Sequence, residues 1–390
     1  MTKYFTLGGV VSLLALSHSS AALSPDFAEA VQTVRAVGSE GRGNAEASRA
    51  WRKLAATDPA DIPALLAAMD GANDLAINWL RSAVDTVASR ASKEQLPSAG
   101  LGNFLLDTRH HPRARRLAFE LISCIDAASA QKLLPGMLND PSLELRRDAV
   151  QKVIDQAAQS FAGNKPGATL LFQQALIFAR DVDQIDGITK RLKEVGQPVD
   201  LVKHFGFLTH WKVIGPFDNA GGAGFEMAYP PETKIDLNAA YDGKSGKIRW
   251  QEFAGTHEYG VVDMNKPCGA LKGVAAYAWT EFYSDQAQPA ELRLACENGW
   301  KIWFNGQYVF GRDEYHRLTE LDQFRLPVGL RSGRNLILVK VCQNEQVEDW
   351  TKRWDFQLRV TDALGTPIPS SAPAVVADAT KPSSSAERKN

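Results

Sequence analysis

Cysteine is scarce in this sequence, and its four cysteines form none of the familiar paired motifs. Long intervals separate Cys124, Cys268, Cys296 and Cys342, which excludes the CxxC pairs of a zinc ribbon and the CxxCH of a c-type haem site. Cys124 lies in an apolar helical segment, where a free cysteine is expected to pack as a small hydrophobic residue. Cys296 and Cys342 fall on two predicted strands of one β-sandwich. They are the candidate disulfide, and Cys268 then stays unpaired.

An excess of charge of either sign is also absent, because 44 Lys and Arg residues face 45 Asp and Glu residues. Nucleic-acid binding depends on basic patches that displace counterions from phosphates. The local basic run at residues 109–116 stands at the start of a predicted helix, and we interpret it as a solvated helix end. We therefore expect no nucleic-acid partner.

Long apolar runs are missing after the first residues. Lys3 is followed by a mainly apolar run, residues 4–16, and then by the small residues Ser19–Ala22, which is the order of a secretory signal peptide. The run is shorter than the ~20 residues that a membrane-spanning helix needs. We expect residues 1–22 to be a cleaved signal peptide. The mature protein should then be secreted or periplasmic, with no membrane insertion after cleavage.

Common catalytic signatures are missing too. The chain has no GxSxG, HExxH or Walker sequence, and no GxGxxG after a predicted strand. His257-Glu258 lacks a second histidine at helical spacing. We therefore expect a protein that is not an enzyme. A glycoside hydrolase-related enzyme component is the less favoured alternative, because the two carboxylates of such a site meet only in the fold.

Helical periodicity dominates residues 23–205. Apolar residues repeat at steps of one and three in segments that begin at Ala83, Leu117 and Ala149, which places them on one stripe of each helix. The segments recur at an interval of about 33 residues, and a fixed period of that size is typical of helical solenoids. Residues 23–205 are therefore predicted to form an α-solenoid.

The entry to the third segment carries a family resemblance. Residues 138–150 read LNDPSLELRRDAV, with Asp140 as a candidate N-cap and Pro141 at the first helical position. This stretch resembles the second-helix start of HEAT-type repeats, although the interval is shorter than their usual ~40 residues. The resemblance implies a HEAT-like domain that serves as a protein-contact surface or a rigid spacer.

From His210 onward, short strands separated by Gly, Pro and Asn turns replace the helices. This pattern indicates an antiparallel β-sandwich rather than a parallel sheet, and we place it at residues 206–365. The Ser-, Pro- and Ala-rich residues 366–390 are predicted to be a disordered tail. The fold class is thus multidomain, α then β.

Two stretches of the β half resemble a known family. Residues 300–309 read WKIWFNGQYV and residues 330–341 read LRSGRNLILVKV, and Asn305-Gly306 is typical of a two-residue hairpin turn. They resemble the galactose-binding-like jelly roll found in family 2 glycoside hydrolases and in carbohydrate-binding modules. Residues 211–232 are similar to a stretch that precedes such a jelly roll in exported planctomycete-type proteins. The resemblance implies a jelly roll and a sugar ligand.

The resemblance also bears on calcium. Related PA14-type domains carry adjacent aspartates before the equivalent tryptophan strand, and in some members these aspartates hold calcium. Here the stretch reads Cys296-Glu297-Asn298-Gly299, without the aspartate pair, and calcium requires about six to eight oxygen ligands. A structural calcium ion is therefore not supported, and we expect no cofactor and no metal.

The predicted sugar site combines rings and polar side chains of the β half. An exposed ring can cover the apolar face of a sugar, while Arg and carboxylate groups bond to its hydroxyls. Trp350 is the favoured ring because residues 348–353 form a polar loop, whereas each tryptophan can instead be a core residue of its strand. The predicted ligand-binding residues are Trp350, Trp300, Trp354, Arg312, Glu314 and His316.

Two functions stay open at this point. In the first, a non-catalytic carbohydrate-binding module is presented on the helical-repeat scaffold and binds a polysaccharide or glycan. In the second, the protein is structural, its solenoid binds an extracytoplasmic protein, and the jelly roll is only a scaffold. Fold resemblance does not decide between them. An exposed aromatic platform favours the first function, and burial of the same rings favours the second.

Overall fold

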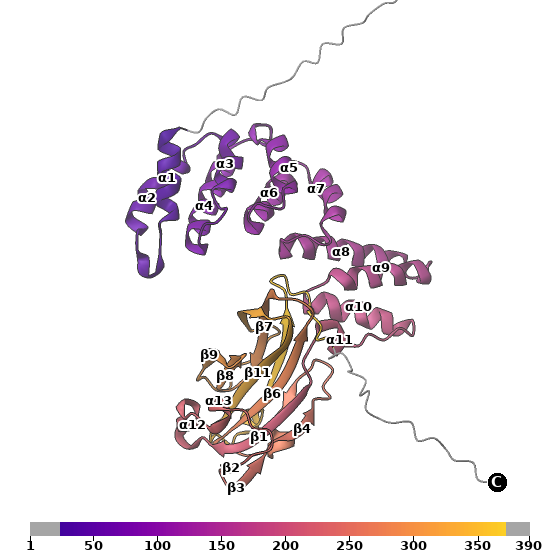
Figure 1. Cartoon of the computed structure of the whole chain (residues 1–390). Coiled ribbons are helices and arrows are strands. Elements are labelled where there is room, and N and C mark those ends of the chain that lie inside the picture. The colour runs from indigo at the N-terminus through magenta and orange to yellow at the C-terminus, as the bar shows by residue number, and fades with distance from the viewer. Residues whose placement is uncertain (1–23, 372–390) are drawn as a thin grey trace, which may run out of the picture. The chain divides into compact units, whose positions relative to one another are not determined.

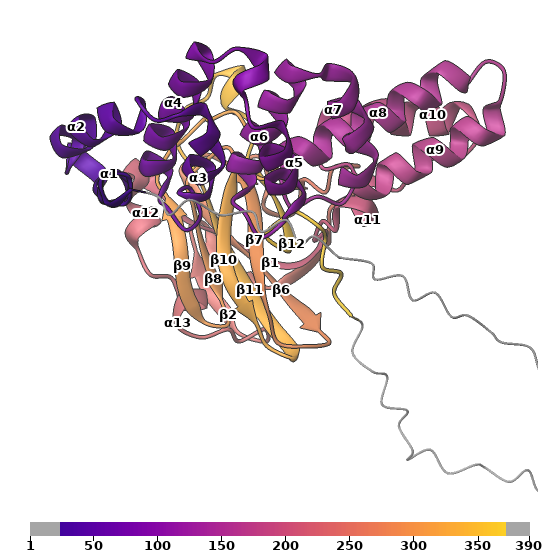
Figure 2. The ribbon, with the colours of Figure 1, turned by 90° about the horizontal axis from the view of Figure 1, so that it is seen from above.

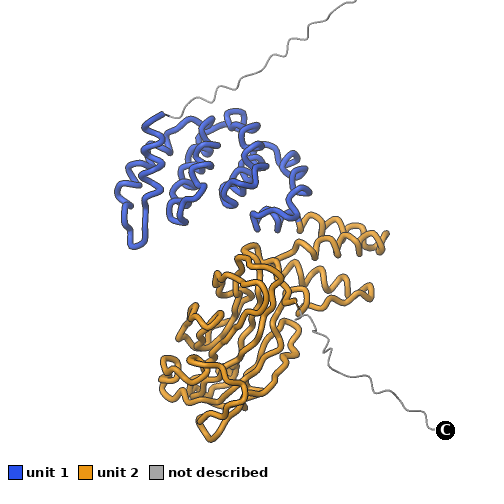
Figure 3. The backbone as a smooth tube through the Cα atoms, viewed as in Figure 1, with its two compact units in different colours: residues 1–149 blue, residues 150–390 orange. Residues whose placement is uncertain are grey.

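The computed structural model describes residues 24–371, with helices first and antiparallel β-sheets after them (Figure 1). This confirms the predicted α-then-β order. The predicted signal peptide lies outside the described residues, as do residues 372–390 of the predicted tail. Residues 366–371 of that tail are ordered instead, because Ile368 N donates to Val360 O and Ser371 N donates to Tyr283 O, both at 2.9 Å. The chain divides into two compact units, residues 1–149 and 150–390 (Figure 3). The predicted division at residue 205 stays a prediction, since helices of residues 165–205 share the second unit with the sheets.

The first unit consists of helices that pack in consecutive pairs, α1 with α2, α3 with α4, and α5 with α6 (Figure 1). Side chains that precede helices cap free backbone amides; Asn73, for example, accepts from Ala76 N at 2.9 Å before α4. The helices are α1 Pro25–Arg35, α2 Asn44–Leu54, α3 Ile62–Ala67, α4 Asp74–Arg90, α5 Ser98–Leu106, α6 Pro112–Ile125 and α7 Ala127–Leu133, and α8 Leu143–Ser160 crosses the unit boundary.

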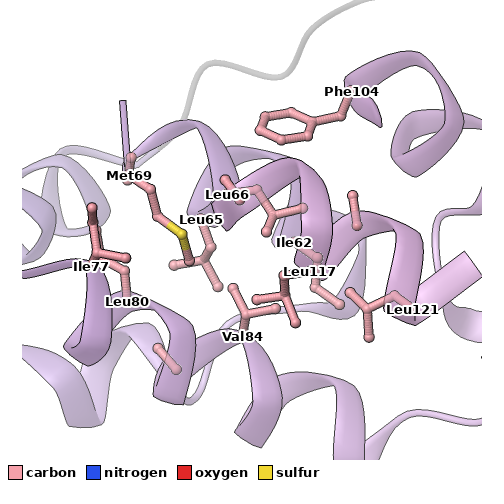
Figure 4. Close-up of a cluster of buried hydrophobic side chains, with 14 of the residues drawn as sticks. Ile62, Leu65, Leu66, Met69, Ile77, Leu80, Val84, Phe104, Leu117 and Leu121 are labelled. Carbon is pink, nitrogen blue, oxygen red and sulfur yellow. The ribbon is translucent and has the colours of Figure 1, made fainter. Parts of the chain in front are cut away.

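A continuous apolar core joins these pairs. Leu65 of α3, Val84 of α4 and Leu117 of α6 point toward one another in Figure 4 and are almost fully buried. Each helix exposes its outer face and buries one stripe, so a single pair could not complete this core alone. The predicted stripes at Ala83 and Leu117 belong to it.

A buried ion pair fixes the approach to α8. Arg115 places Nη1 and Nη2 2.6 and 2.7 Å from the two carboxylate oxygens of Asp140, and both side chains are at least 95 % buried. Asp140 also accepts from Ser142 N at 2.7 Å. The helix begins at Leu143, two residues later than Pro141 suggested, and Asp140 both pairs with Arg115 and accepts from a backbone amide just before the helix.

Three further helices open the second unit: α9 Lys165–Phe178, α10 Val182–Glu194 and α11 Leu201–Phe205. Helices α9 and α10 lie side by side in Figures 1 and 2. Contacts within the unit connect these helices to the β-strands, since Tyr259 donates its hydroxyl to Asp186 of α10 and Arg359 donates to Phe205 O of α11 at 3.2 Å.

All strand pairs of the second unit are antiparallel. The six-stranded sheet has the order β4-β1-β6-β11-β8-β9, from Gln251–Ala254, His210–Asp218, Val274–Ser284, Gly333–Gln343, Trp300–Phe304 and Gln307–Arg312. The four-stranded sheet has the order β10-β7-β12-β5, from Phe324–Leu330, Gln288–Cys296, Asp355–Thr361 and Val262–Asp263. A separate hairpin pairs β2 Ala240–Gly243 with β3 Gly246–Arg249.

The core of the second unit lies between its two large sheets. Alternate residues of β11 and β8, such as Val339 and Ile302, meet Leu292 and Leu358 of the four-stranded sheet. The predicted Asn305-Gly306 turn connects β8 and β9, and both residues have positive φ, 51° and 80°.

The outer face of the six-stranded sheet is buried as well. Trp279, Leu338 and Trp303 stand in register across β6, β11 and β8 on this face. Residues 219–250 cover it with the short helices α12 Ala223–Glu226 and α13 Pro230–Thr233 and the β2–β3 hairpin (Figure 1). A fully buried Lys340 anchors this cover, because its Nζ donates to Phe225 O at 3.0 Å, Met227 O at 2.8 Å and Glu232 Oε1 at 2.8 Å.

Candidate functional site

One end of the sandwich gathers several loops of the second unit. Strand register places the end of β1 beside the start of β6, and the end of β11 beside the start of β8. The connecting segments that meet at this loop end are residues 219–224, 269–273, 297–299, 313–323 and 344–354. Every predicted polar site residue lies here, because Arg312 ends β9 and residues 313–323 follow it.

Trp350 stands on this loop end with 59 % of its surface exposed. Its neighbour Thr351 is fully buried, and the Thr351 hydroxyl lies 2.8 Å from the carbonyls of both Gln346 and Glu348. Lys272 Nζ also donates to Thr351 O at 2.6 Å. The exposed ring therefore sits on a short helical turn whose next residue is anchored in the protein.

His316 supports the Trp350 ring from the side. The two ring centroids are 5.2 Å apart with an interplanar angle of 82°, an edge-to-face contact. Asn344 Oδ1 accepts from Gln346 N at 3.2 Å, which identifies it as the amide oxygen, so His316 Nε2 donates to it at 2.9 Å. The backbone of His316 also donates to Asn298 Oδ1 at 3.1 Å. These bonds hold the imidazole beside Trp350.

Arg312 and Glu314 are accessible polar groups of the same loop. Glu314 has weak ion pairs with Arg312 at 3.8 Å and with Arg317 at 3.6 Å, and all three side chains are at least 39 % exposed. Such exposed pairs contribute little to stability. A planar guanidinium and a carboxylate can therefore exchange these contacts for the hydroxyls of a ligand.

Trp300 and Trp354 do not belong to this surface, which corrects their prediction as ligand-binding residues. They are 1 % and 0 % exposed. Trp300 points into the inter-sheet core, where its ring centroid lies 4.8 Å from that of Phe324, and Trp354 donates its indole N–H to Val341 O at 3.3 Å. The physical reason is strand alternation, since the inward face of β8 carries Trp300, Ile302 and Phe304.

The candidate disulfide is not formed in the structure, where all four cysteines are free thiols. Cys296 is buried in the inter-sheet core, while Cys342 faces the covered outer side of the six-stranded sheet. Burial raises the pKa of Cys342 and of Cys268 to about 12. These thiols are therefore neutral packing groups at physiological pH.

A network of buried amide side chains beneath the loop end was not predicted from the sequence. Asn298 donates to Arg353 O at 2.7 Å, Gln343 donates to the carbonyls of Thr351 and Arg353 at 3.1 and 3.0 Å, and Asn219 donates to Gln343 O at 3.1 Å. Asn298, Gln343 and Asn219 are at most 1 % exposed. These hydrogen bonds connect several loops to one another, so the surface of the loop end is preorganised.

Two carboxylates share one arginine beside this network. Arg353 Nε lies 3.0 Å from Glu297 Oε2 and 3.1 Å from Asp355 Oδ2. Burial raises the pKa of both carboxyls, and the Arg353 charge opposes that rise. Among residues 24–371, no three His, Cys, Asp or Glu side chains are grouped as metal ligands.

Comparisons with known proteins give only distant structural likeness. No family model and no curated protein matches the chain. One similar structure is an anti-sigma factor domain-containing protein from Clostridium clariflavum, at 11 % identity and a TM-score of 0.25, which covers 42 % of this chain and 48 % of that chain. Another is the PA14 domain of the MpAFP antifreeze protein, at 12 % identity and a TM-score of 0.21, which covers 42 % of this chain and 69 % of that chain.

Four of the six predicted ligand-binding residues lie on the surface of the loop end, and the two that do not are the buried tryptophans Trp300 and Trp354. The loop end carries His316, Arg312, Glu314 and Trp350. There the His316 ring contacts the Trp350 ring, and the imidazole is held by Asn344, which lies 28 residues further along the chain. The amide network had one signal in the sequence, the polar residue Gln343 at the end of the mainly apolar run 336–342 of β11. Across the described part of the chain, no helix is both long and apolar enough to span a membrane.

Proposed function

We propose that the second unit is a non-catalytic carbohydrate-binding module of an exported protein, and that its helical repeats present it. The observation that carries the proposal is Trp350, an exposed ring that is held in place by the anchored Thr351 and by the edge of His316. An aromatic ring of this kind can cover the apolar face of one sugar unit. Export itself rests on the signal-like residues 1–22.

Two polar side chains of the loop end, Arg312 and Glu314, complete the proposed site. Arg312 and Glu314 can bond to sugar hydroxyls because solvent already surrounds them. One exposed ring on an open surface buries little ligand area, so we expect a dissociation constant on the order of millimolar for a single sugar unit. A polysaccharide that presents many equivalent units would be retained more strongly than its monomer.

Affinity electrophoresis of the full chain in gels that contain soluble polysaccharides tests this function. We expect retardation by at least one polysaccharide and its loss in Trp350→Ala. Tyr308→Ala is the matched control, because Tyr308 is 56 % exposed on β9 but lies outside the loop end. Absence of retardation by every polysaccharide, or equal retardation of Trp350→Ala and wild type, would refute the proposal.

The alternative function has an observation of its own in the first unit. A groove of about 630 Å³ lies between the α1–α2 connection and α4, where Leu75 is 46 % exposed and Trp79 lines the wall. This groove suits an apolar anchor of a protein partner. The alternative predicts an extracytoplasmic partner whose capture resists free sugars, is lost in Leu75→Glu and persists in Trp350→Ala.

A further inference from the structure

A small pocket lies on the outer face of the six-stranded sheet, beneath the covering segment. Its volume is about 150 Å³. The tryptophans of the cross-strand row, Trp279 and Trp303, line it together with Leu336 and Leu338 of β11. The covering segment supplies the opposite wall with residues 231–235. The pocket is separate from the loop end that carries Trp350.

The volume and the walls indicate a ligand of one ring. An engineered apolar cavity of about 150 Å³ in another protein binds benzene, so a single six-membered ring is the matching size. The walls here are two indoles and several aliphatic side chains, which favour a flat apolar ring by offset or edge-to-face contact.

Two polar atoms at the pocket wall can bond to a ligand, and one of them is a buried donor without a partner among residues 24–371. Trp279 is 4 % exposed, and its indole Nε1 has no hydrogen-bond acceptor there. A buried donor without a partner is unfavourable, and an acceptor on a ligand would relieve that cost. Glu232 also lines the pocket; its Oε1 accepts from Lys340 at 2.8 Å and from the Tyr277 hydroxyl, and its Oε2, which is not one of the buried unpaired atoms, can accept a further hydrogen bond. The wall therefore offers one donor and one acceptor.

Charge and hydrogen-bonding capacity narrow the ligand class. Lys340 neutralises Glu232, and Lys234 adds a further positive charge at the wall, so an ammonium ligand is disfavoured despite the two indoles. A pyranose carries several hydroxyls, most of which would lose water without a partner in this pocket. A ring with a single hydroxyl satisfies both polar atoms, because a hydroxyl accepts from one group and donates to another.

We propose that this pocket binds a small neutral phenol. The aromatic ring lies against Trp279 and Trp303, the phenol oxygen accepts from Trp279 Nε1, and the phenol hydroxyl donates to Glu232 Oε2. This site is independent of the proposed sugar site, so Trp350→Ala leaves it intact and failure of either proposal does not affect the other.

The direct test is an NMR titration of the full chain, followed on the indole N–H cross-peaks. The Trp279 cross-peak is assigned by its absence from the Trp279→Phe spectrum. Phenol should shift it saturably, with a dissociation constant on the order of millimolar. Toluene, which lacks the hydroxyl, should bind about two- to tenfold more weakly. Methyl glucoside and tetramethylammonium should leave the cross-peak unmoved.

Variants separate the pocket from the rest of the surface. Leu336→Trp should fill the pocket and abolish the phenol response, while Leu271→Trp, at a residue that is 41 % exposed and does not line the pocket, should preserve it. Trp279→Phe, followed on the indole cross-peak of Trp303 in the same pocket, should bind phenol as weakly as wild type binds toluene. No saturable response of the wild-type chain to phenol, a response retained by Leu336→Trp, or saturable binding of methyl glucoside at the Trp279 cross-peak would each overturn the proposal.

Discussion

Asp322 forms ion pairs with two buried arginines that stand directly opposite each other on neighbouring strands. Arg293 of β7 and Arg359 of β12 are register partners, and their side chains are 3 % and 4 % exposed. Asp322 accepts from Arg293 Nη1 at 2.6 Å and from Arg359 Nε at 2.7 Å. Glu291 offers Arg293 a second carboxylate, whereas the other acceptors of Arg359 are backbone carbonyls.

Asp322→Asn should therefore strongly destabilise the second unit. Removing one partner of a buried ion pair typically costs about 3–5 kcal/mol, because the remaining charge stays buried and uncompensated. For a unit of this size such a loss lowers the melting temperature by roughly 10 °C. Asp322 has φ 60°, a conformation that asparagine adopts as readily as aspartate, so backbone strain does not add to the effect.

The pH dependence of the same variant gives an independent check. Burial alone would raise the pKa of Asp322, but hydrogen bonds and charges from Arg359 and Arg293 outweigh it and lower this pKa. A carboxyl with a lowered folded-state pKa contributes its stability above the unfolded-state pKa of about 3.9 and loses it as the pH falls through the folded value. The difference between wild type and Asp322→Asn should be full at pH 7 and shrink below pH ~4.

Thermal unfolding followed by circular dichroism at pH 7 and in acid measures both effects. Asp349→Asn is the control, since Asp349 pairs with Lys352 at 2.5 Å but is 94 % exposed, and it should leave the melting temperature unchanged. An Asp322→Asn variant that melts within about 2 °C of wild type at pH 7 would show that these arginines are adequately solvated or paired without Asp322.

A buried ion pair and a half-buried neutral histidine lead to further predictions. Asp140→Ala should destabilise the first unit by about 3–5 kcal/mol in urea unfolding, because it leaves the fully buried Arg115 without its carboxylate; equal stability would contradict this. Burial, together with Arg180 and Arg359, lowers the pKa of His204 to about 4. Since unfolding lets His204 take up a proton, wild type should lose stability as the pH falls from about 6.5 toward 4. His204→Gln should lose less stability over that window in melting experiments, and parallel curves would refute the assignment.

The spacing of apolar residues was sufficient to predict the order of helices and strands, because each places its buried residues at a different interval. The stripes beginning at Ala83 and Leu117 are core faces of α4 and α6, and the Asn305-Gly306 turn has the backbone that its residue types require. Buried polar links escaped the same reasoning. Asp140 seemed a helix cap in sequence, but its actual partner Arg115 lies 25 residues earlier, and no local spacing reveals such a pair.

The tryptophans show the limit of alternation most clearly. In a sheet with one solvated face, alternate side chains of β8 would point to solvent. The position of each ring along the strand would then predict whether it is exposed and can bind a ligand. Here residues 219–250 cover the outer face, so Trp300 is buried inward while Trp303 is buried outward. A strand between two layers buries side chains on both of its faces, so alternation along it does not identify an exposed ring. Among the predicted tryptophans, the exposed one is Trp350, which lies in a loop. The unpaired indole of Trp279 is buried because residues 219–250, a segment distant in sequence from most of this sheet, cover it.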